Sequence, residues 1–178
     1  YDSQILRREE IFLQTKFTHA GGQDHRLPYE LHADPATQVR QSFASSLEHL
    51  TTDYLDSYVL HGPSLRSGLA DEDVAVWRAM EEIHRRGLVK HLGVSNVSYE
   101  QLALLHQLAE VKPAFVQNRC FAVKRWDRAV RMFCKDNAIV YQGFSLLTAN
   151  PQVLVHPIVQ AIARRLTATP AQVVFKFC

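Results

Sequence analysis

The chain has 178 residues, of which 47% are hydrophobic and 21% are charged, so it is too apolar to be intrinsically disordered. Its formal net charge of +2 does not suit binding to nucleic acid or to an anionic membrane surface. No apolar run approaches the roughly 18 residues of a membrane span, and the N-terminal residues lack the apolar region of a signal peptide. We therefore expect a cytoplasmic protein with no nucleic-acid or membrane partner.

The cysteines and histidines give no metal motif. Cys120, Cys134 and Cys178 are an odd number without CxxC or metal-ligand spacing, and we expect reduced thiols. The nine histidines are scattered along the chain. Close pairs such as His19 and His25 lie in a polar segment without the spacing of a zinc site. We therefore expect no metal site.

The first part of the chain alternates apolar runs that suit buried strands with amphipathic segments that suit helices. Strands are expected over residues 11–17, 55–60 and 90–96. A polar loop over 18–36 leads into a helix that begins at Asp34 and Pro35, a typical N-cap and first helical residue. Further helices are expected over 73–86, closed by Gly87, and over 98–109. Trp77 is expected to pack the first of these two helices against the sheet.

The same alternation continues to the end of the chain. Strands are expected over 113–118 and 138–142, and helices over 127–137, over 152–165 and from Thr169 and Pro170 onward. A group of basic residues with one aromatic is expected to form a solvated helix face; it comprises Arg125, Trp126, Arg128 and Arg131.

Strand spacing and strand ends together indicate the fold. The midpoints of the five strands are separated by 43, 35, 23 and 24 residues, which leaves room for the helical crossovers that parallel sheets require. This spacing allows a doubly wound sheet or an arc of a (β/α)8 barrel. No GxGxxG follows the first strand, as a Rossmann sheet usually has. Polar residues instead end the strands, where a barrel carries its chemistry. We therefore predict an α/β protein with about five βα units of a (β/α)8 barrel.

Each polar strand-end residue also has a simpler structural explanation. Lys16 suits a solvated loop mouth, and His61 suits a strand cap or a packing contact with Trp77. Ser95 and Asn96 suit an N-cap for the helix over 98–109. Gln117 suits a hydrogen bond to a neighbouring backbone group. Taken together, however, successive strands end in groups that suit one polar ligand.

Five ordered segments resemble the aldo-keto reductase family. They are QTK (14–16), VLHGP (59–63), LGVSN (92–96), KPAFVQ (112–117) and YQGFS (141–145). The family is built on a (β/α)8 barrel and reduces aldehydes and ketones with NADPH, without a metal. The resemblance therefore implies a partial NADP-dependent oxidoreductase domain over residues 1–178, an NADPH cofactor and a small carbonyl substrate.

The resemblance also implies a role for individual residues. Lys16 matches the lysine that lowers the pKa of the proton-donating tyrosine, and His61 matches the histidine that orients the carbonyl and donates to its oxygen. Ser95, Asn96 and Gln117 match the residues that hydrogen-bond the nicotinamide carboxamide. The cofactor site extends to the pair Phe144 and Ser145, where Phe144 matches the aromatic residue that stacks on the nicotinamide.

Two further functional classes remain open at this point. One is a non-catalytic nucleotide-binding or regulatory subunit on the same barrel, and the other is an inactive truncated relative. The presence of both Lys16 and His61 favours the enzyme, because a protein that only binds the nucleotide has no evident need for a proton-relay lysine.

Some parts of the family pattern fall outside these 178 residues. The catalytic tyrosine and its partner aspartate precede the lysine by more residues than the chain has, and Tyr1 is given no role. The segment that binds the adenosine 2′-phosphate would follow Cys178. A complete barrel typically needs about 250 residues, and an arc of parallel strands leaves two open edges. We therefore expect this sequence to be the central part of a longer reductase, from roughly the third to the seventh βα unit.

The intact mass of the native polypeptide tests this expectation. We expect a mass above 20.3 kDa by several kDa at each end, measured by mass spectrometry on protein from its source cells. A mass of 20.3 kDa would contradict it and would favour nucleotide binding or loss of function over catalysis.

Overall fold

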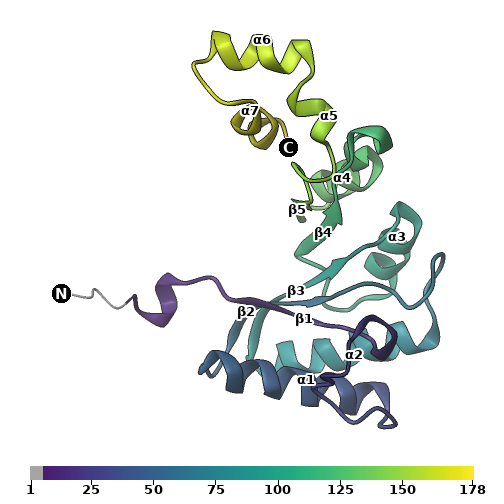
Figure 1. Ribbon diagram of the computed structural model, residues 1–178. Helices are drawn as coiled ribbons and strands as arrows, with labels where there is room; N and C mark the ends of the chain where they lie inside the picture. The colour runs from purple at the N-terminus through teal and green to yellow at the C-terminus, as the bar shows by residue number, and fades with distance from the viewer. Residues whose placement is uncertain (1–5) are drawn as a thin grey trace. The chain divides into compact units, whose positions relative to one another are not determined.

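The computed structural model describes residues 6–178, so Tyr1 lies outside the described residues. The chain forms two compact units, Tyr1–Val116 and Gln117–Cys178, and each is described here by itself (Figure 1). Strands follow one another in the sheet in chain order, from β1 to β5. The prediction of parallel strands that alternate with helices is confirmed.

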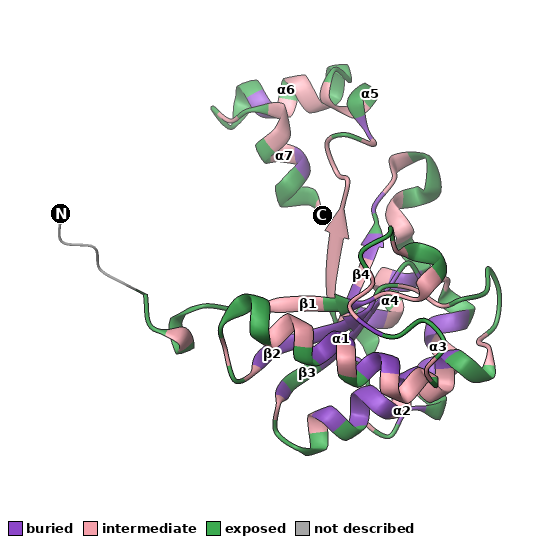
Figure 2. Cartoon of the chain, turned by 60° about the horizontal axis from the view of Figure 1, so that its bottom comes forward, coloured by how far each residue is buried: buried purple, intermediate pink, exposed green. Residues whose placement is uncertain are grey.

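Three parallel strands form the centre of the first unit. They are β1 (Gln14–Phe17), β2 (Leu55–Leu60) and β3 (Val89–Ser95). Every residue of β2 is buried, as Figure 2 shows in purple. The bounds of β2 agree with the prediction, whereas β1 begins later than expected. Ile11 and Phe12, which the sequence placed in that strand, are exposed and lie between a short 3-10 helix (Arg8–Glu10) and β1.

The helices of this unit are α1 (Pro35–Leu50), α2 (Asp71–Arg85) and α3 (Tyr99–Leu108). As predicted, Asp34 caps α1 by accepting a hydrogen bond from the Thr37 backbone N–H. Gly87 ends the α2 segment with a φ of +75°, a conformation that favours glycine. Helices α1 and α2 lie on the same side of the three strands (Figure 1).

Buried apolar side chains join these helices to the sheet. The rings of Phe43 on α1 and Tyr58 on β2 pack edge to face, with centroids 5.1 Å apart. Trp77 on α2 is 2% exposed, and its indole N–H donates to the Val111 carbonyl at 3.3 Å. This burial agrees with the expectation that Trp77 packs its helix against the sheet.

The register of the strands decides which side chains share the opposite face. Lys16 of β1 is paired with Val59 of β2, and Val59 is paired with Gly93 of β3. Because side chains alternate between the two faces of a strand, residues two positions further along project from the same face. This arrangement places a second row of side chains, those of Thr18, His61 and Ser95, at the carboxyl ends of the strands.

Strand β4 (Phe115–Arg119) follows β3, and the Ala114 backbone N–H donates to the Leu92 carbonyl. In the second unit, β5 (Val140–Phe144) lies beside β4, where the Cys120 N–H donates to the Phe144 carbonyl at 3.2 Å. A 3-10 segment (Ala122–Asp127) and α4 (Arg128–Asp136) connect these strands.

The expected basic helix face over this connection is wrong. Arg125 and Trp126 have φ values of +56° and +57°, so both lie in the left-handed region rather than in a helix. Only Arg128 and Arg131 lie on α4. The four residues therefore do not form one helical face.

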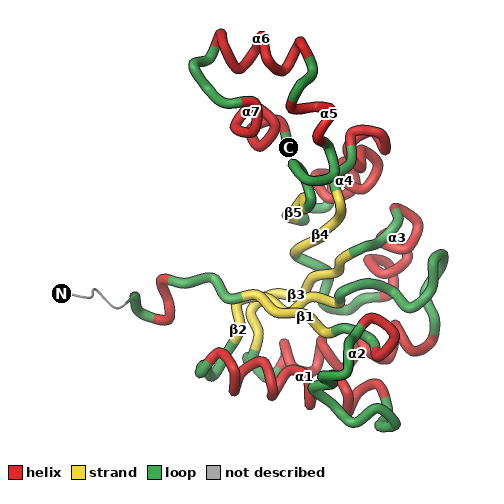
Figure 3. The backbone as a smooth tube through the Cα atoms, viewed as in Figure 1, coloured by secondary structure: helices red, strands yellow, loops and turns green. Residues whose placement is uncertain are grey.

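The single helix expected over 152–165 is also wrong, because the segment is two helices. They are α5 (Pro151–Leu154) and α6 (Pro157–Arg165), drawn as separate coils in Figure 3. Pro157 starts the second helix, and His156 before it is extended, as a residue that precedes proline prefers to be. The helix expected from Thr169 and Pro170 is confirmed as α7 (Pro170–Phe177), which Thr169 caps. Over residues 6–178, no helix has both the length and the apolar character needed to cross a bilayer.

The close packing at Gly93 yields a stability test. A Cβ at this position would lie 2.9 Å from the Phe115 carbonyl oxygen and 3.1 Å from Val59 Cγ2. We expect Gly93→Ala to lower the free energy of unfolding by about 1–3 kcal/mol, the usual cost of overpacking. Urea denaturation followed by circular dichroism measures this change. Gly21→Ala is the matched control, since nothing lies within 4 Å of its added Cβ. Equal stability of the two variants would contradict this packing.

Candidate functional site at the strand ends

The ends of β1 and β2 border an open cleft of about 620 Å3 in the first unit. Of the predicted site residues, His61 and Asn96 line this cleft. Lys16 precedes it on β1 and is exposed, and Ser95 lies at the end of β3 with 1% exposure. The first unit therefore brings four of the predicted residues to one end of its strands.

His61 is held at both its backbone and its ring. Its N–H donates to the Phe17 carbonyl at 2.8 Å and so continues the ladder between β1 and β2. Its Nδ1 lies 2.9 Å from the hydroxyl of Thr18. Burial lowers the pKa of His61, and the nearby ammonium of Lys16 lowers that pKa further. The imidazole is therefore neutral at physiological pH.

Ser95 and Asn96 do not cap the following helix, so that simpler explanation is wrong. The N-cap of α3 is Ser98, whose hydroxyl accepts from the Gln101 N–H while the Gln101 side chain accepts from the Ser98 N–H. Asn96 instead has a φ of +52° and turns its amide back to β2. Its Nδ2 donates to the His61 carbonyl at 2.8 Å and to Ser95 Oγ at 3.2 Å.

A second histidine, His19, also lines the cleft, although no functional role was expected for it from the sequence. His19 Nε2 lies 3.1 Å from Asp73 Oδ1, and His19 Nδ1 lies 3.4 Å from Glu72 Oε1. Asp73 is 1% exposed and also accepts from the backbone N–H groups of Ser64 and Ala70. The Asp73 carboxylate beside the ring raises the pKa of His19, and the negative charge of Glu72 adds to this effect, although burial opposes it.

The remaining predicted residues lie in the second unit. Gln117 on β4 donates through Nε2 to Gln142 Oε1 on β5 at 2.6 Å, so the amide has a side-chain partner rather than only the backbone partner that the simpler explanation suggested. Phe144 is half-buried at the end of β5, with the guanidinium of Arg119 5.6 Å from its ring centre. Ser145 follows with a φ of +55° and accepts from the Ala149 N–H through its carbonyl.

A polar network in the second unit was also missed by sequence reasoning. The carboxylate of Asp127 accepts from Asn118 Nδ2 at 2.8 Å and from the Tyr141 hydroxyl at 3.0 Å. Burial and the negative charge of Asp127 raise the pKa of Tyr141, which keeps this phenol protonated. Nothing in the sequence spacing indicates this network, because it depends on the left-handed turn that ends at Asp127.

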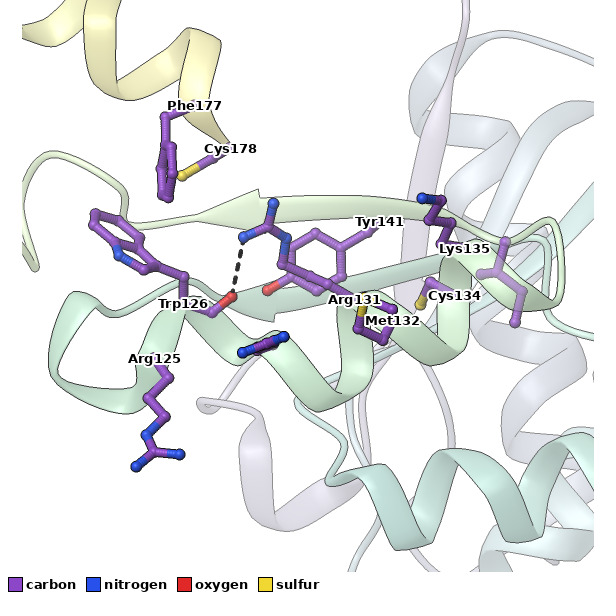
Figure 4. Close-up of a pocket in the computed structure, with 11 residues that line it drawn as sticks. Arg125, Trp126, Arg131, Met132, Cys134, Lys135, Tyr141, Phe177 and Cys178 are labelled. Atoms are coloured by element: carbon purple, nitrogen blue, oxygen red, sulfur yellow. Dashed lines mark hydrogen bonds between the residues drawn. The ribbon is translucent and has the colours of Figure 1, made fainter.

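The second unit contains a cleft of its own, of about 500 Å3 (Figure 4). Trp126 and Phe177 pack edge to face at 5.3 Å on one side of it, and Arg131 donates to the Trp126 carbonyl at 3.4 Å. Burial raises the pKa of the Cys134 thiol to about 11, so this lining residue is protonated. None of the predicted site residues lines this cleft.

Comparison with known proteins defines the family to which the chain belongs. The model of the aldo/keto reductase family matches residues 4–150. A curated relative is aldo-keto reductase family 4 member C11 of Arabidopsis thaliana, 28% identical over 99% of this chain and 57% of that protein. Another is glyoxal reductase of Bacillus subtilis, 30% identical over 97% of this chain and 55% of that protein. The crystal structure of an aldo/keto reductase from Brucella melitensis is 26% identical, with a TM-score of 0.77 over 96% of this chain and 59% of that one.

The chain therefore belongs to the aldo/keto reductase family. It spans about half the length of the curated relatives it matches. The predicted family is confirmed, and so is the prediction that the strands and helices are βα units of the barrel that this family uses.

The His19 pair predicts a pH-dependent contribution to stability. Because the folded-state pKa is raised, the pair stabilises the fold fully below the unfolded pKa of about 6.5, and this stabilisation is lost as pH rises through the folded-state pKa. Burial alone would raise the pKa of Asp73, but the nearby ring of His19 and the backbone N–H groups of Ser64 and Ala70 lower it overall, so this carboxylate stays charged throughout that range.

We expect His19→Gln to lower the melting temperature by several degrees at about pH 5.5 and by much less at about pH 8.5. His25→Gln, in the same loop but exposed, is the matched control. Thermal denaturation at both pH values measures the effect. A decrease in the melting temperature of His19→Gln that is the same at both pH values would contradict the ion pair.

Proposed function

We propose that the protein reduces the carbonyl group of small aldehydes or ketones to an alcohol with NADPH as the reductant. The observation that carries this proposal is the placement of His61 and Lys16 at the ends of two paired strands, where the ammonium of Lys16 adds to the effect of burial in lowering the pKa of His61. The family to which the chain belongs supports the same reaction. Residues 1–178 are then part of one reductase domain, and the small carbonyl substrate binds at the cleft beside His61.

His61 acts on the substrate oxygen in this proposal. A neutral imidazole with a proton on Nε2 donates a hydrogen bond to a carbonyl oxygen, and this bond strengthens as negative charge develops there. A protonated imidazolium beside the Lys16 ammonium would be disfavoured, because two like charges repel. The lowered pKa of His61 therefore suits a hydrogen-bond donor that does not itself lose its proton.

Lys16 acts on the proton donor. By the family resemblance that donor is a tyrosine, and a nearby ammonium favours the phenolate form, so the phenol gives up its proton more easily near neutral pH. The side chain of Lys16 is exposed at the end of β1, so it can reach a group that approaches this end of the strands.

The residues assigned to the cofactor have the chemistry that a nicotinamide carboxamide needs. That carboxamide carries both a donor and an acceptor, which amide and hydroxyl side chains match. Asn96 donates through Nδ2. Within residues 6–178 its Oδ1 accepts none of these hydrogen bonds, so this oxygen can accept one from the N–H group of the carboxamide. Ser95 and Gln117 supply a hydroxyl and a second amide. Phe144 and Ser145 would contact the nicotinamide ring, with the π face of Phe144 stacked on it. When bound, NADPH supplies the hydride.

Lys16→Met tests the catalytic assignment. We expect kcat for NADPH-dependent reduction of a panel of aldehydes and ketones to fall by about 100-fold or more, since general acid–base catalysis contributes about that much. Binding of NADPH, followed by quenching of protein fluorescence, should change little. Lys124→Met, an exposed lysine of the second unit, is the matched control.

The same experiment separates the other functional classes. Carbonyl reduction that survives Lys16→Met undiminished would overturn the role of Lys16. Tight NADPH binding by the unmodified protein with no turnover on any carbonyl would favour a regulatory nucleotide-binding protein. Absence of NADPH binding would favour an inactive relative.

A further inference from the structure

Thr18 lies where it can control the proton on His61. It follows Lys16 by two positions and projects from the same face, just beyond the end of β1. Its hydroxyl oxygen lies 2.9 Å from His61 Nδ1, a distance that fits one hydrogen bond. The hydroxyl, the ring of His61 and the loop after β1 all line the same cleft.

The rest of Thr18 is held in place by its surroundings. Its carbonyl accepts a hydrogen bond from the Tyr29 hydroxyl at 2.7 Å, and Tyr29 is 6% exposed with its ring packed on Phe17. Its methyl group lies against Gly22, where an added Cβ would come within 2.9 Å of Thr18 Cγ2. The loop from His19 to Tyr29 therefore folds back to hold Thr18, with its hydroxyl left for His61.

The hydrogen bond between Thr18 and His61 links the hydroxyl proton to the tautomer of the ring. A neutral imidazole carries a single proton, on Nδ1 or on Nε2. If the hydroxyl donates to Nδ1, the ring proton lies on Nε2, and if Nδ1–H donates to the hydroxyl, Nε2 carries none. In the part of the chain that the structure describes, His61 Nδ1 lies at hydrogen-bond distance from the Thr18 hydroxyl, and the tautomer of the ring decides which of the two donates. Donation from the hydroxyl to Nδ1 is the arrangement in which the hydroxyl proton has an acceptor among these residues.

We propose that Thr18 is a positioning residue, whose hydroxyl donates to Nδ1 of His61 and holds the ring in the Nε2–H tautomer. The consequence for carbonyl reduction rests on the proposed function, because only the Nε2–H tautomer can donate to a substrate oxygen from that nitrogen. The tautomer itself is a property of the protein alone and can be measured without any turnover.

Nitrogen-15 NMR of histidine-labelled protein, recorded well above the pKa of His61, reads the tautomer directly. The His61 signals are assigned by their loss in His61→Gln. We expect Nδ1 of the unmodified protein to give the shift of a nitrogen without a proton and Nε2 that of a nitrogen with one. In Thr18→Val, which removes the hydroxyl but keeps the shape, the two shifts should move toward each other as the tautomers mix. Thr18→Ser should restore the original shifts.

Thr15→Val is the matched control. It makes the same substitution three residues earlier, within β1, and its buried hydroxyl has no hydrogen-bond partner within residues 6–178. A resting His61 that carries its proton on Nδ1, or a Thr18→Val spectrum identical to that of Thr15→Val, would overturn the proposal. Circular dichroism of each variant confirms that the comparison is between folded proteins.

Kinetics then separate this proposal from the proposed function. We expect Thr18→Val to lower kcat for carbonyl reduction by about tenfold, the effect of one hydrogen bond, with little change in KM. The expected tautomer with no turnover in the unmodified protein would overturn the proposed function and leave the role of Thr18 intact. Turnover that Thr18→Val leaves unchanged would overturn the catalytic consequence of the tautomer and leave the proposed function intact.

Discussion

The parallel register of β1, β2 and β3 is the constraint on which the candidate site depends. Pairing Lys16 with Val59 and Val59 with Gly93 puts these residues in one row across the open face of the sheet. Because side chains alternate along a strand, the next row on that face consists of Thr18, His61 and Ser95. A shift of one residue in either pairing would turn one of these side chains toward the helices and break the row. The absence of a side chain at Gly93 permits the close approach of β4 that supports this register.

Two histidines line one cleft in opposite electrostatic settings. His61 lies near the ammonium of Lys16, and both burial and that charge lower its pKa. His19 lies against the carboxylates of Asp73 and Glu72, which raise its pKa. The surroundings of His61 therefore favour its neutral form, whereas the carboxylates beside His19 favour its charged form. This difference suits a division of roles in which His61 donates a hydrogen bond to a ligand and His19 anchors the loop after β1 to the start of α2.

Local sequence signals predicted the fold best where a single residue type controls the backbone. The caps at Asp34 and Thr169 were found because each side chain satisfies an N–H group of the first helical turn. The prediction of one helix over 152–165 is wrong because Pro157 starts a second helix after the extended His156. The left-handed turn at Arg125 and Trp126 had no signal, since neither residue is glycine.

The sequence by itself determined the family, the alternation of strands and helices, and the identity of the polar residues at the strand ends, because these follow from residue types in a fixed order. Only the tertiary structure decided which of these side chains meet. It showed that Ser98 rather than Ser95 caps α3, that Asn96 turns back to His61, and that Thr18 and His19 join the cleft. These contacts depend on the register between strands about 40 residues apart and on the folding of a polar loop, neither of which local periodicity specifies.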